Sequence, residues 1–301
     1  MADGSVRRRA RARVAAVVRA VRDRNIGAAA APIPPGLWDD RSRALVPDEA
    51  LWAIAERYRG SFLPPHISYG TVRDFVDSTE TLPRLVAGSL QSTGTLDMKN
   101  LQRCWALKAV LGSVEPGARV VEIGAGEPLV AGVLSRIGYD VVVVDPYDGS
   151  GNGPIEYRSF KRAYPNVTFV RDLFPPQDPI RGSVGCAYSI SVLEHLSADD
   201  ATATATAARE LVGDGGVCVH AIDHVLRGWG AEEHVQRLKR IASASGLSVE
   251  QVDAILERMD ADPDTYLVSA EAHNTWRGQI PYDEYPMRRI GSVQLFDRVG
   301  S

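Results

Sequence analysis

The stretch Val120-Val121-Glu122-Ile123-Gly124-Ala125-Gly126-Glu127-Pro128 is the most informative part of the chain. Its mostly apolar first half has the composition of a short buried strand, and two glycines and a proline follow it. Glycine lets the backbone take dihedral angles that a Cβ would forbid, and it lets the backbone approach a ligand closely. Proline is well tolerated in the first turn of a helix. The stretch therefore predicts a strand, a ligand-binding turn and a helix in direct succession.

The same alternation of strand and helix continues towards the C-terminus. Short runs rich in β-branched residues predict strands at 119–123, 140–145, 167–170, 184–190 and 217–222. Helical spacing predicts helices near 128–137, 155–164, 199–212 and 231–245. Such alternation indicates βαβ units and a mainly parallel sheet.

The last part of the chain predicts a different ending to the sheet. A helix near 248–260 begins at Ser248 with Gln251 three residues later, which is the pattern of a capping box. Two strands are expected at 265–270 and 289–299, without a long helix between them. We therefore expect the sheet to end in an antiparallel strand.

The N-terminal third is expected to be helical and divided into two segments. Residues 1–35 contain an Arg-rich helix and a Pro/Ala linker, residues 36–112 a helical lid, and residues 113–301 the main domain. Helices are expected near 47–58, 70–88 and 97–111. The eight arginines of residues 1–24 favour a solvated or oligomer-contacting helix. A basic arm on an anionic surface and a targeting segment remain alternatives, although Arg19, Arg22 and Arg24 interrupt the apolar stretch that an export signal requires.

Composition narrows the class of protein. The 301 residues are 45% hydrophobic and 24% charged, as in an ordinary globular protein. The net charge of -4 offers no general attraction to nucleic acid. Three cysteines without C-x-x-C spacing favour neither a disulfide framework nor a zinc site, and they predict a reducing, cytoplasmic location. Apolar runs are too short to span a membrane.

Two nucleotide-binding patterns compete for the glycine-rich turn. A dinucleotide fingerprint requires glycine at the sixth position of G-x-G-x-x-G, where this chain has Leu129. The alternative has an acidic residue two positions before the first glycine, as Glu122 is. This pattern resembles the first motif of class I S-adenosylmethionine-dependent methyltransferases, acidic-x-Gly-x-Gly-x-Gly, with Pro128 in place of the third glycine.

The resemblance continues at the ends of the next three strands. Asp145-Pro146 ends the second strand and Arg171-Asp172-Leu173 follows the third, where the family has acids that contact the ribose and the adenine. The fourth strand leads into Ser189-Ile190-Ser191-Val192-Leu193-Glu194-His195-Leu196, which is similar to the S-x-x-x-L-E-H segment of small-molecule methyltransferases. The cofactor-binding residues that the resemblance implies are Glu122, Gly124, Ala125, Gly126, Asp145, Pro146, Asp172, Leu173, Ser189 and Ser191.

The resemblance also implies a fold and a cofactor. The expected fold is α/β and Rossmann-like, a doubly wound, mainly parallel seven-stranded sheet with an antiparallel last strand and a helical N-terminal extension. The cofactor is S-adenosyl-L-methionine, and its product is S-adenosyl-L-homocysteine.

Polar residues at the ends of the fourth and fifth strands indicate where the chemistry takes place. Methyl transfer to a hydroxyl needs a base, and histidine is the side chain most easily tuned for this role near neutral pH. We predict that His224, supported by Asp223, is the general base, with His195 beside Glu194 as the second choice.

A metal-dependent reaction is the alternative for these residues. Some methyltransferases bind a divalent cation at an E-x-x-E-H run, whose first glutamate is Ser191 here. One lost carboxylate weakens a hard-cation site, so we predict no metal, although Glu194, His195 and His224 leave this question open.

The acceptor is the least defined part of the prediction. Trp105 and the segment from His273 to Arg288 carry aromatic and basic side chains for an acceptor pocket. We expect O-methylation of a small molecule, a sugar-like or natural-product hydroxyl, by a protein that does not bind membranes and can form a homo-oligomer. The alternatives are an RNA-directed methyltransferase tethered by the Arg-rich helix and a non-catalytic, cofactor-binding regulatory protein.

Overall fold

The computed structural model describes residues 48–85, 97–149, 154–228, 230–268 and 289–300. The Arg-rich segment with its linker and the acceptor segment from His273 to Arg288 lie outside these residues.

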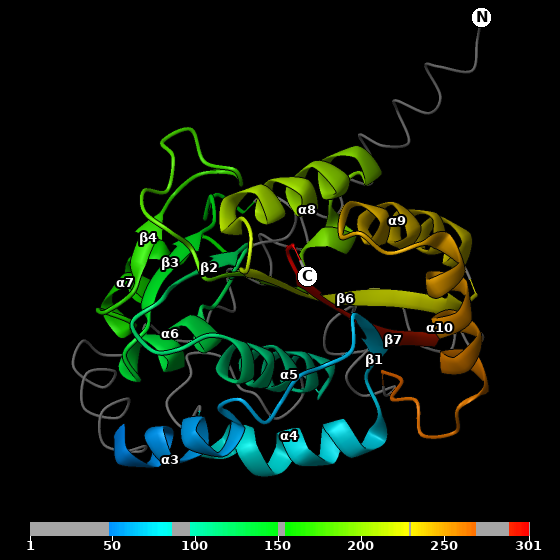
Figure 1. The fold of residues 1–301 in the computed structure, drawn as a ribbon, viewed down its shortest axis with the longest axis horizontal. Helices are drawn as coiled ribbons and strands as arrows, with labels where there is room; N and C mark the ends of the chain where they lie inside the picture. The colour runs from blue at the N-terminus through cyan, green and yellow to red at the C-terminus, as the bar shows by residue number, and fades with distance from the viewer. Residues whose placement is uncertain (1–47, 86–96, 150–153, 229, 269–288, 301) are drawn as a thin grey trace, which may run out of the picture. The chain divides into compact units, whose positions relative to one another are not determined.

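A seven-stranded sheet forms the centre of the described structure (Figure 1). Its strands are β1 (Ile67–Tyr69), β2 (Arg119–Ile123), β3 (Asp140–Val144), β4 (Thr168–Val170), β5 (Cys186–Ile190), β6 (Val217–Arg227) and β7 (Arg289–Arg298). They lie in the order β1-β7-β6-β5-β2-β3-β4. The pairs from β4 to β6 are parallel, and β7 is antiparallel to both β6 and β1. The predicted Rossmann-like sheet with an antiparallel last strand is confirmed.

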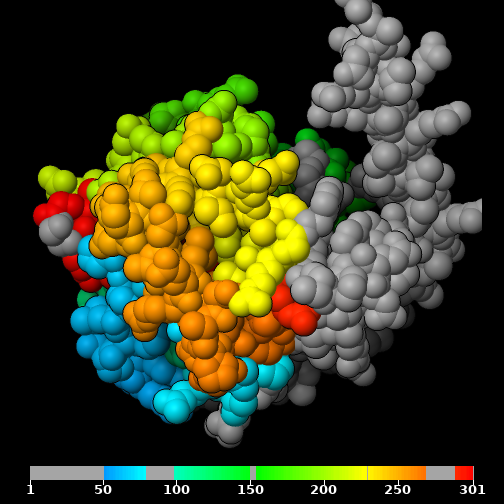
Figure 2. Space-filling model, turned by 90° about the vertical axis from the view of Figure 1, so that its right-hand side faces the viewer, coloured from blue at the N-terminus to red at the C-terminus, as the bar shows by residue number. Residues whose placement is uncertain are grey.

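Helices cover both faces of the sheet. Their bounds are α3 (Asp48–Tyr58), α4 (Val72–Leu85), α5 (Asp97–Ser113), α6 (Leu129–Arg136), α7 (Tyr157–Ala163), α8 (Ala198–Val212), α9 (Ala231–Ala244) and α10 (Val249–Ala261). In Figure 1, α8 and α9 lie above the sheet, and α3, α4, α5 and α6 lie below it. Helices α9 and α10 form much of the surface seen from the side in Figure 2. These bounds lie close to those that periodicity predicts.

One edge of the sheet differs from the prediction. The strand at this edge is β1, which comes from the N-terminal part of the chain and pairs with β7. Residues 265–268, expected to begin a strand, form only an isolated bridge between Thr265 and Thr71. Because β1 and the buried helix α5 belong to the same sheet and core as the rest, the boundary expected at residue 113 divides elements that pack together.

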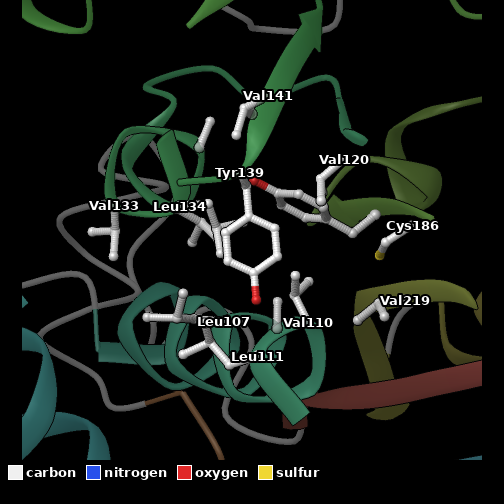
Figure 3. Packing of buried hydrophobic residues seen from close by; sticks show 14 of the residues in the cluster. Leu107, Val110, Leu111, Val120, Val133, Leu134, Tyr139, Val141, Cys186 and Val219 are labelled. Atoms are coloured by element: carbon white, nitrogen blue, oxygen red, sulfur yellow. The ribbon is translucent and has the colours of Figure 1, made fainter. Parts of the chain in front are cut away.

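The main core lies between the sheet and helices α5 and α6. Tyr139 stands between these helices and β2, with its ring near Leu134 and Leu107 (Figure 3). Its hydroxyl donates a hydrogen bond to the carbonyl of Val114 at 2.7 Å, so the buried polar end is satisfied. This packing holds α5 against the strands whose ends carry the polar residues of the site.

Local signals explain where the later helices begin. Helix α10 starts with the predicted capping box, in which the Gln251 amide donates to Ser248 Oγ and the Ser248 amide donates to Gln251 Oε1. Helix α8 is capped by Ser197, and Asp199 and Asp200 lie in its first turn, where the helix dipole favours acids.

Candidate functional site

Two glycines shape the turn between β2 and α6, through their backbone conformation and the space that they leave. Gly124 and Gly126 have φ of 64° and 56°, in the left-handed region that favours glycine. A Cβ on Gly124 would lie 2.8 Å from Val192 Cγ1, so this position cannot carry a larger residue without a shift of the neighbouring loop. Among the described residues, a Cβ on Gly126 would meet only Pro154 at 3.9 Å, so these residues leave space beside Gly126.

Asp145 at the end of β3 joins this turn to the neighbouring strand. Its Oδ2 accepts a hydrogen bond from the Gly126 amide at 3.0 Å, and its Oδ1 accepts one from the Tyr147 amide at 2.8 Å. Burial raises the pKa of Asp145, while the two amides lower it. Each oxygen keeps a second lone pair, so the carboxylate can also accept hydrogen bonds from two neighbouring hydroxyls of a ligand.

The buried carboxyl of Glu122 links strand β2, which precedes the turn, to helix α6, which follows it. Its Oε2 accepts hydrogen bonds from the Tyr188 hydroxyl at 2.8 Å and from the Ala131 amide at 3.3 Å. Ala131 lies in the first turn of α6, so Glu122 holds the N-terminus of that helix against β2 and β5. Burial raises the pKa of Glu122 to about 8, so this carboxyl is largely protonated at neutral pH in the cofactor-free protein.

Ser191 directly after β5 is held by a buried polar network. Its hydroxyl lies 2.7 Å from Asp223 Oδ1 and 2.7 Å from Gln102 Oε1, so one proton is shared between two acceptors. Gln102 Nε2 donates to Asp223 Oδ1 at 2.8 Å and to Ser292 Oγ at 3.2 Å. Ser191 has a φ of 49°, a conformation that costs energy for a residue with a Cβ. The network from α5, β6 and β7 keeps the chain in this turn, which places Val192 against Gly124.

Glu194 and His195 follow this turn in a short 3₁₀ helix, Leu193–His195. Glu194 Oε1 lies 3.9 Å from His195 Nε2, and the Glu194 side chain is 3% exposed whereas that of His195 is 40% exposed. Burial and the neighbouring Asp223 charge raise the pKa of Glu194 to about 8, and Lys99 opposes this shift. The pair therefore joins a buried carboxyl to an accessible imidazole.

The expectation that Asp223 supports His224 is wrong. Strand β6 does not end at residue 222 but continues to Arg227, because its pairing with β7 continues to Arg289. Consecutive residues of a strand point to opposite faces. Asp223 accordingly contacts Gln102 of α5, while His224 lies on the other face near His234 of α9, with ring centroids 6.1 Å apart.

His224 is deeply buried at this position. It is 1% exposed, and its Nε2 has no hydrogen-bond partner among the described residues. Burial, with a smaller contribution from His234, lowers the pKa of His224 to about 3, so the ring is neutral at physiological pH.

Three further predicted residues are placed differently from what their motifs suggest. Ser189 is fully buried and hydrogen-bonded to His220 Nδ1 at 2.8 Å. The carboxylate of Asp172 accepts from the amides of Leu173 and Gln177, so it organises the loop after β4. Trp105 is 3% exposed within the main core and cannot stack on an acceptor.

Helix α5 contributes residues that the motifs did not indicate. Lys99 Nζ donates to the Ile190 carbonyl at 3.4 Å, and Gln102 belongs to the Ser191 network. The guanidinium of Arg103 lies near Glu122 and Tyr164 and lowers the pKa of both groups. The available signal was the spacing of Lys99, Gln102 and Arg103, which are three and four residues apart and so lie on one face of the helix.

Two further properties of the described residues concern metal binding and membrane insertion. In the part of the chain that the structure describes, no group of three or more His, Cys, Asp or Glu side chains is placed to hold a metal ion. None of the described helices combines the length and the apolar character that a bilayer-spanning segment needs.

A family model for the methyltransferase domain matches residues 98–261, from the start of α5 to the end of α10. The comparison with curated proteins finds no match. Among solved structures, the CcbJ methyltransferase from Streptomyces caelestis is 25% identical over 38% of this chain and 50% of its own, with a TM-score of 0.33. The phosphoethanolamine N-methyltransferase 2 of Haemonchus contortus, in complex with S-adenosyl-L-methionine, is 18% identical over 88% of this chain and 61% of its own, with a TM-score of 0.40. A TehB-like S-adenosylmethionine-dependent methyltransferase from Corynebacterium glutamicum is 16% identical over 74% of this chain and 98% of its own, with a TM-score of 0.37.

The match of the family model extends over more than half of the chain, and it coincides with the sheet and the glycine-rich turn. The chain therefore belongs to the methyltransferase domain family of class I S-adenosylmethionine-dependent enzymes. It is a transferase, and S-adenosyl-L-methionine is its cofactor. The residues present fit this cofactor, because the turn at Gly124 and Gly126 leaves room for it and Asp145 offers acceptors for its ribose hydroxyls.

Proposed function

We propose that this protein transfers the methyl group to a hydroxyl of a small-molecule acceptor, a sugar-like or natural-product alcohol. The observation that carries the proposal is the pair of Glu194 and His195 after β5, with Nε2 and Oε1 3.9 Å apart. This pair follows the C-terminal end of a central parallel strand, where ligands bind in open α/β sheets. It combines an accessible base with a buried group that can stabilise the charge of that base.

Each part of the site has a role in this reaction. The cofactor supplies a methyl group on a positively charged sulfur, which is already a good leaving group. Asp145 and the turn at Gly124 and Gly126 hold the cofactor, and Ser191 and Val192 close the turn from the β5 side. His195 would accept the proton of the acceptor hydroxyl, and its role is confined to this proton transfer. Holding the reacting groups in line provides much of the rate enhancement in such a transfer.

Glu194 assists His195 through its position and its protonation. A carboxylate 3.9 Å from an imidazole stabilises the imidazolium that forms when the proton is taken, so this role requires the ionised form of Glu194. A pKa of about 8 lets Glu194 hold or release a proton near neutral pH, as proton transfer requires.

The exposure of the two histidines favours His195 over His224 as the base. A group with a pKa of about 3 is a poor proton acceptor at neutral pH, and His224 is almost inaccessible to an acceptor. His195 is accessible and contacts the carboxyl that can stabilise its charged form. We therefore assign His195 the role that the sequence alone favoured for His224.

A small-molecule acceptor agrees with the charge of the chain. The net charge of -4 does not attract a nucleic acid backbone, which argues against an RNA substrate. The segment from His273 to Arg288, which the sequence favours for the acceptor pocket, lies outside the described residues.

The test is a screen of hydroxyl-bearing sugars and natural products with an isotopically labelled methyl donor, followed by kinetics of two histidine variants. Removal of a general base typically lowers the rate by about 10²–10⁴-fold, so His195→Ala should reduce kcat by this factor with little change in cofactor affinity. His224→Leu is the matched control and should keep kcat within a few-fold of the wild type. Full turnover of His195→Ala, together with inactivity of a folded His224→Leu protein, would reverse the assignment.

A further inference from the structure

The carboxyl of Glu194 is buried without the hydrogen bonds that a buried carboxylate normally has. Its side chain is 3% exposed, and neither oxygen has a hydrogen-bond partner among the described residues. The imidazole of His195 lies 3.9 Å from Oε1, beyond hydrogen-bond distance. The charges around such a group have a large influence on whether it is ionised. The proposed proton transfer to His195 needs this carboxyl in its ionised form.

Two side chains of opposite charge act on this carboxyl from the neighbouring elements. Asp223 of β6 is held in place by Ser191, whose hydroxyl lies 2.7 Å from Oδ1, and by Gln102, which donates to Oδ1 at 2.8 Å. Lys99 of α5 donates from Nζ to the last carbonyl of β5 at 3.4 Å. Burial and Asp223 raise the pKa of Glu194, while Lys99 and, less strongly, two backbone amides lower it.

The other charged groups near the 3₁₀ helix of Glu194 are engaged by different partners. Arg237 of α9 donates from Nη1 to the backbone carbonyl of Glu194 at 2.5 Å. The acids in the first turn of α8 each have a contact of their own, Asp199 with the guanidinium of Arg240 and Asp200 with the hydroxyl of Ser197. Among the described residues, Lys99 therefore has the largest effect in favour of an ionised Glu194.

We propose that Lys99 is a positioning residue of the methyl transfer, whose ammonium group favours the ionised carboxyl of Glu194 beside His195. This carboxylate stabilises the imidazolium that forms when His195 accepts the proton of the acceptor hydroxyl. Lys99 acts through Glu194 and Asp223 opposes it, so the two charges together set the pH at which the pair becomes active. The inference rests on the proposed function, because it requires His195 to be the base.

The first test follows the ionisation of Glu194 directly and needs no acceptor. Carbon-13 NMR of the glutamate carboxyls of the full chain measures its pKa, and Glu194→Gln assigns the signal. A neighbouring charge shifts a pKa by about one to three units, so Lys99→Met should raise the pKa of Glu194 by about one unit or more. Asp223→Asn removes the opposing charge but keeps an oxygen that accepts from Gln102, so it should lower this pKa. Lys99→Arg keeps the charge and should remain close to the wild type.

The second test connects this ionisation to the reaction. Because the ionised form of Glu194 is the active one, kcat should rise with pH as Glu194 loses its proton. With an acceptor found in the screen, this rising limb should move to higher pH in Lys99→Met and to lower pH in Asp223→Asn. The displacements should equal those of the NMR titration. A lower kcat in Lys99→Met at every pH, with an unshifted limb, would overturn the proposal.

Two controls separate this role from a contact with the cofactor and from a general effect of charge. Lys239→Met removes a lysine from its ion pair with Asp253 and should shift neither the titration nor the pH profile. Calorimetry should show that Lys99→Met binds S-adenosylhomocysteine within a few-fold of the wild type. A large loss of this affinity with an unshifted titration would assign Lys99 to the cofactor and overturn the proposal.

Failure of the inference can be told apart from failure of the proposed function. An active enzyme in which Lys99→Met leaves the titration of Glu194 unchanged contradicts the inference alone. A wild-type protein that methylates no hydroxyl acceptor, although Lys99→Met shifts the titration, contradicts the proposed function and with it the role of Lys99 in catalysis.

Discussion

The hydroxyl of Ser191 lies 2.7 Å from Asp223 Oδ1 and thereby joins the loop after β5 to the middle of β6. Ser191 is one of two described non-glycine residues with positive φ, and its neighbour Val192 packs against Gly124. Gln102 of α5 contacts both residues of the pair, so a helix, two strands and a strained turn share one buried network. The position of the Glu194–His195 pair follows directly from this turn.

The first prediction concerns the two contributions of Ser191. Ser191→Ala removes the hydroxyl and leaves Gln102 Oε1 without its donor, which should lower the free energy of unfolding by about 1–3 kcal/mol. Ser191→Gly also removes the hydroxyl, but it relieves a left-handed conformation that costs about 1–2 kcal/mol for a residue with a Cβ. Urea unfolding should therefore rank the proteins as wild type, Ser191→Gly and Ser191→Ala, with the last least stable. Equal stability of the alanine variant and the wild type would show that the network does not hold the turn.

The same network illustrates what the sequence could and could not predict. Strands β2 to β5 and the helices between them follow from β-branched runs and glycine turns, which are local signals. Strand β1 has only three residues and depends on β7 for its pairing, so periodicity did not reveal it. The partners of Ser191 are 89 and 32 residues away along the chain, and only the folded sheet brings them together.

The error at Asp223 and His224 has the same physical origin. Their local sequence looks like the end of a strand, but antiparallel pairing with β7 extends β6 to Arg227 and buries both residues. Within a strand, adjacent side chains point to opposite faces, so the two residues separate. The motif residues at the glycine-rich turn could be predicted because they are contiguous.

The second prediction concerns Asp145 and cofactor affinity. Asp145→Ala should weaken the binding of S-adenosylmethionine by about 1.5–3 kcal/mol, because charged hydrogen bonds to the ribose are lost. Asp145→Asn keeps one oxygen that can accept from an amide and should show a smaller loss. Asp172→Ala provides the comparison in the loop after β4, where the carboxylate accepts from the amides of Leu173 and Gln177. Calorimetry measures all three variants, and an unaffected Asp145→Ala would show that the ribose is held elsewhere.

The last prediction concerns the pH dependence of stability in the cofactor-free protein. Burial raises the pKa of Glu122 and of Glu194 from an ordinary value of 4.5 to about 8. The folded protein then binds more protons than the unfolded chain between these values, so the free energy of unfolding falls as the pH rises from about 4.5 to 8. Burial lowers the pKa of His220 to about 4 and of His224 to about 3. For these rings the unfolded chain binds more protons, so stability rises as the pH increases towards 6.5.

Together these groups predict a stability maximum between about pH 4.5 and 6.5, where the opposing slopes cancel, and a decline from pH 6.5 to 8. Each group contributes at most about 1.4 kcal/mol per pH unit. Glu122→Gln keeps an oxygen that can accept from Tyr188 and Ala131 but cannot ionise, so it should flatten the decline above pH 6.5. His224→Leu should instead shift the midpoint of acid unfolding to lower pH and leave the alkaline limb unchanged. Urea unfolding at intervals from pH 4 to 9 measures both slopes, and a wild-type stability that increases from pH 6.5 to 8 would contradict the assignment of Glu122 and Glu194 as neutral buried acids.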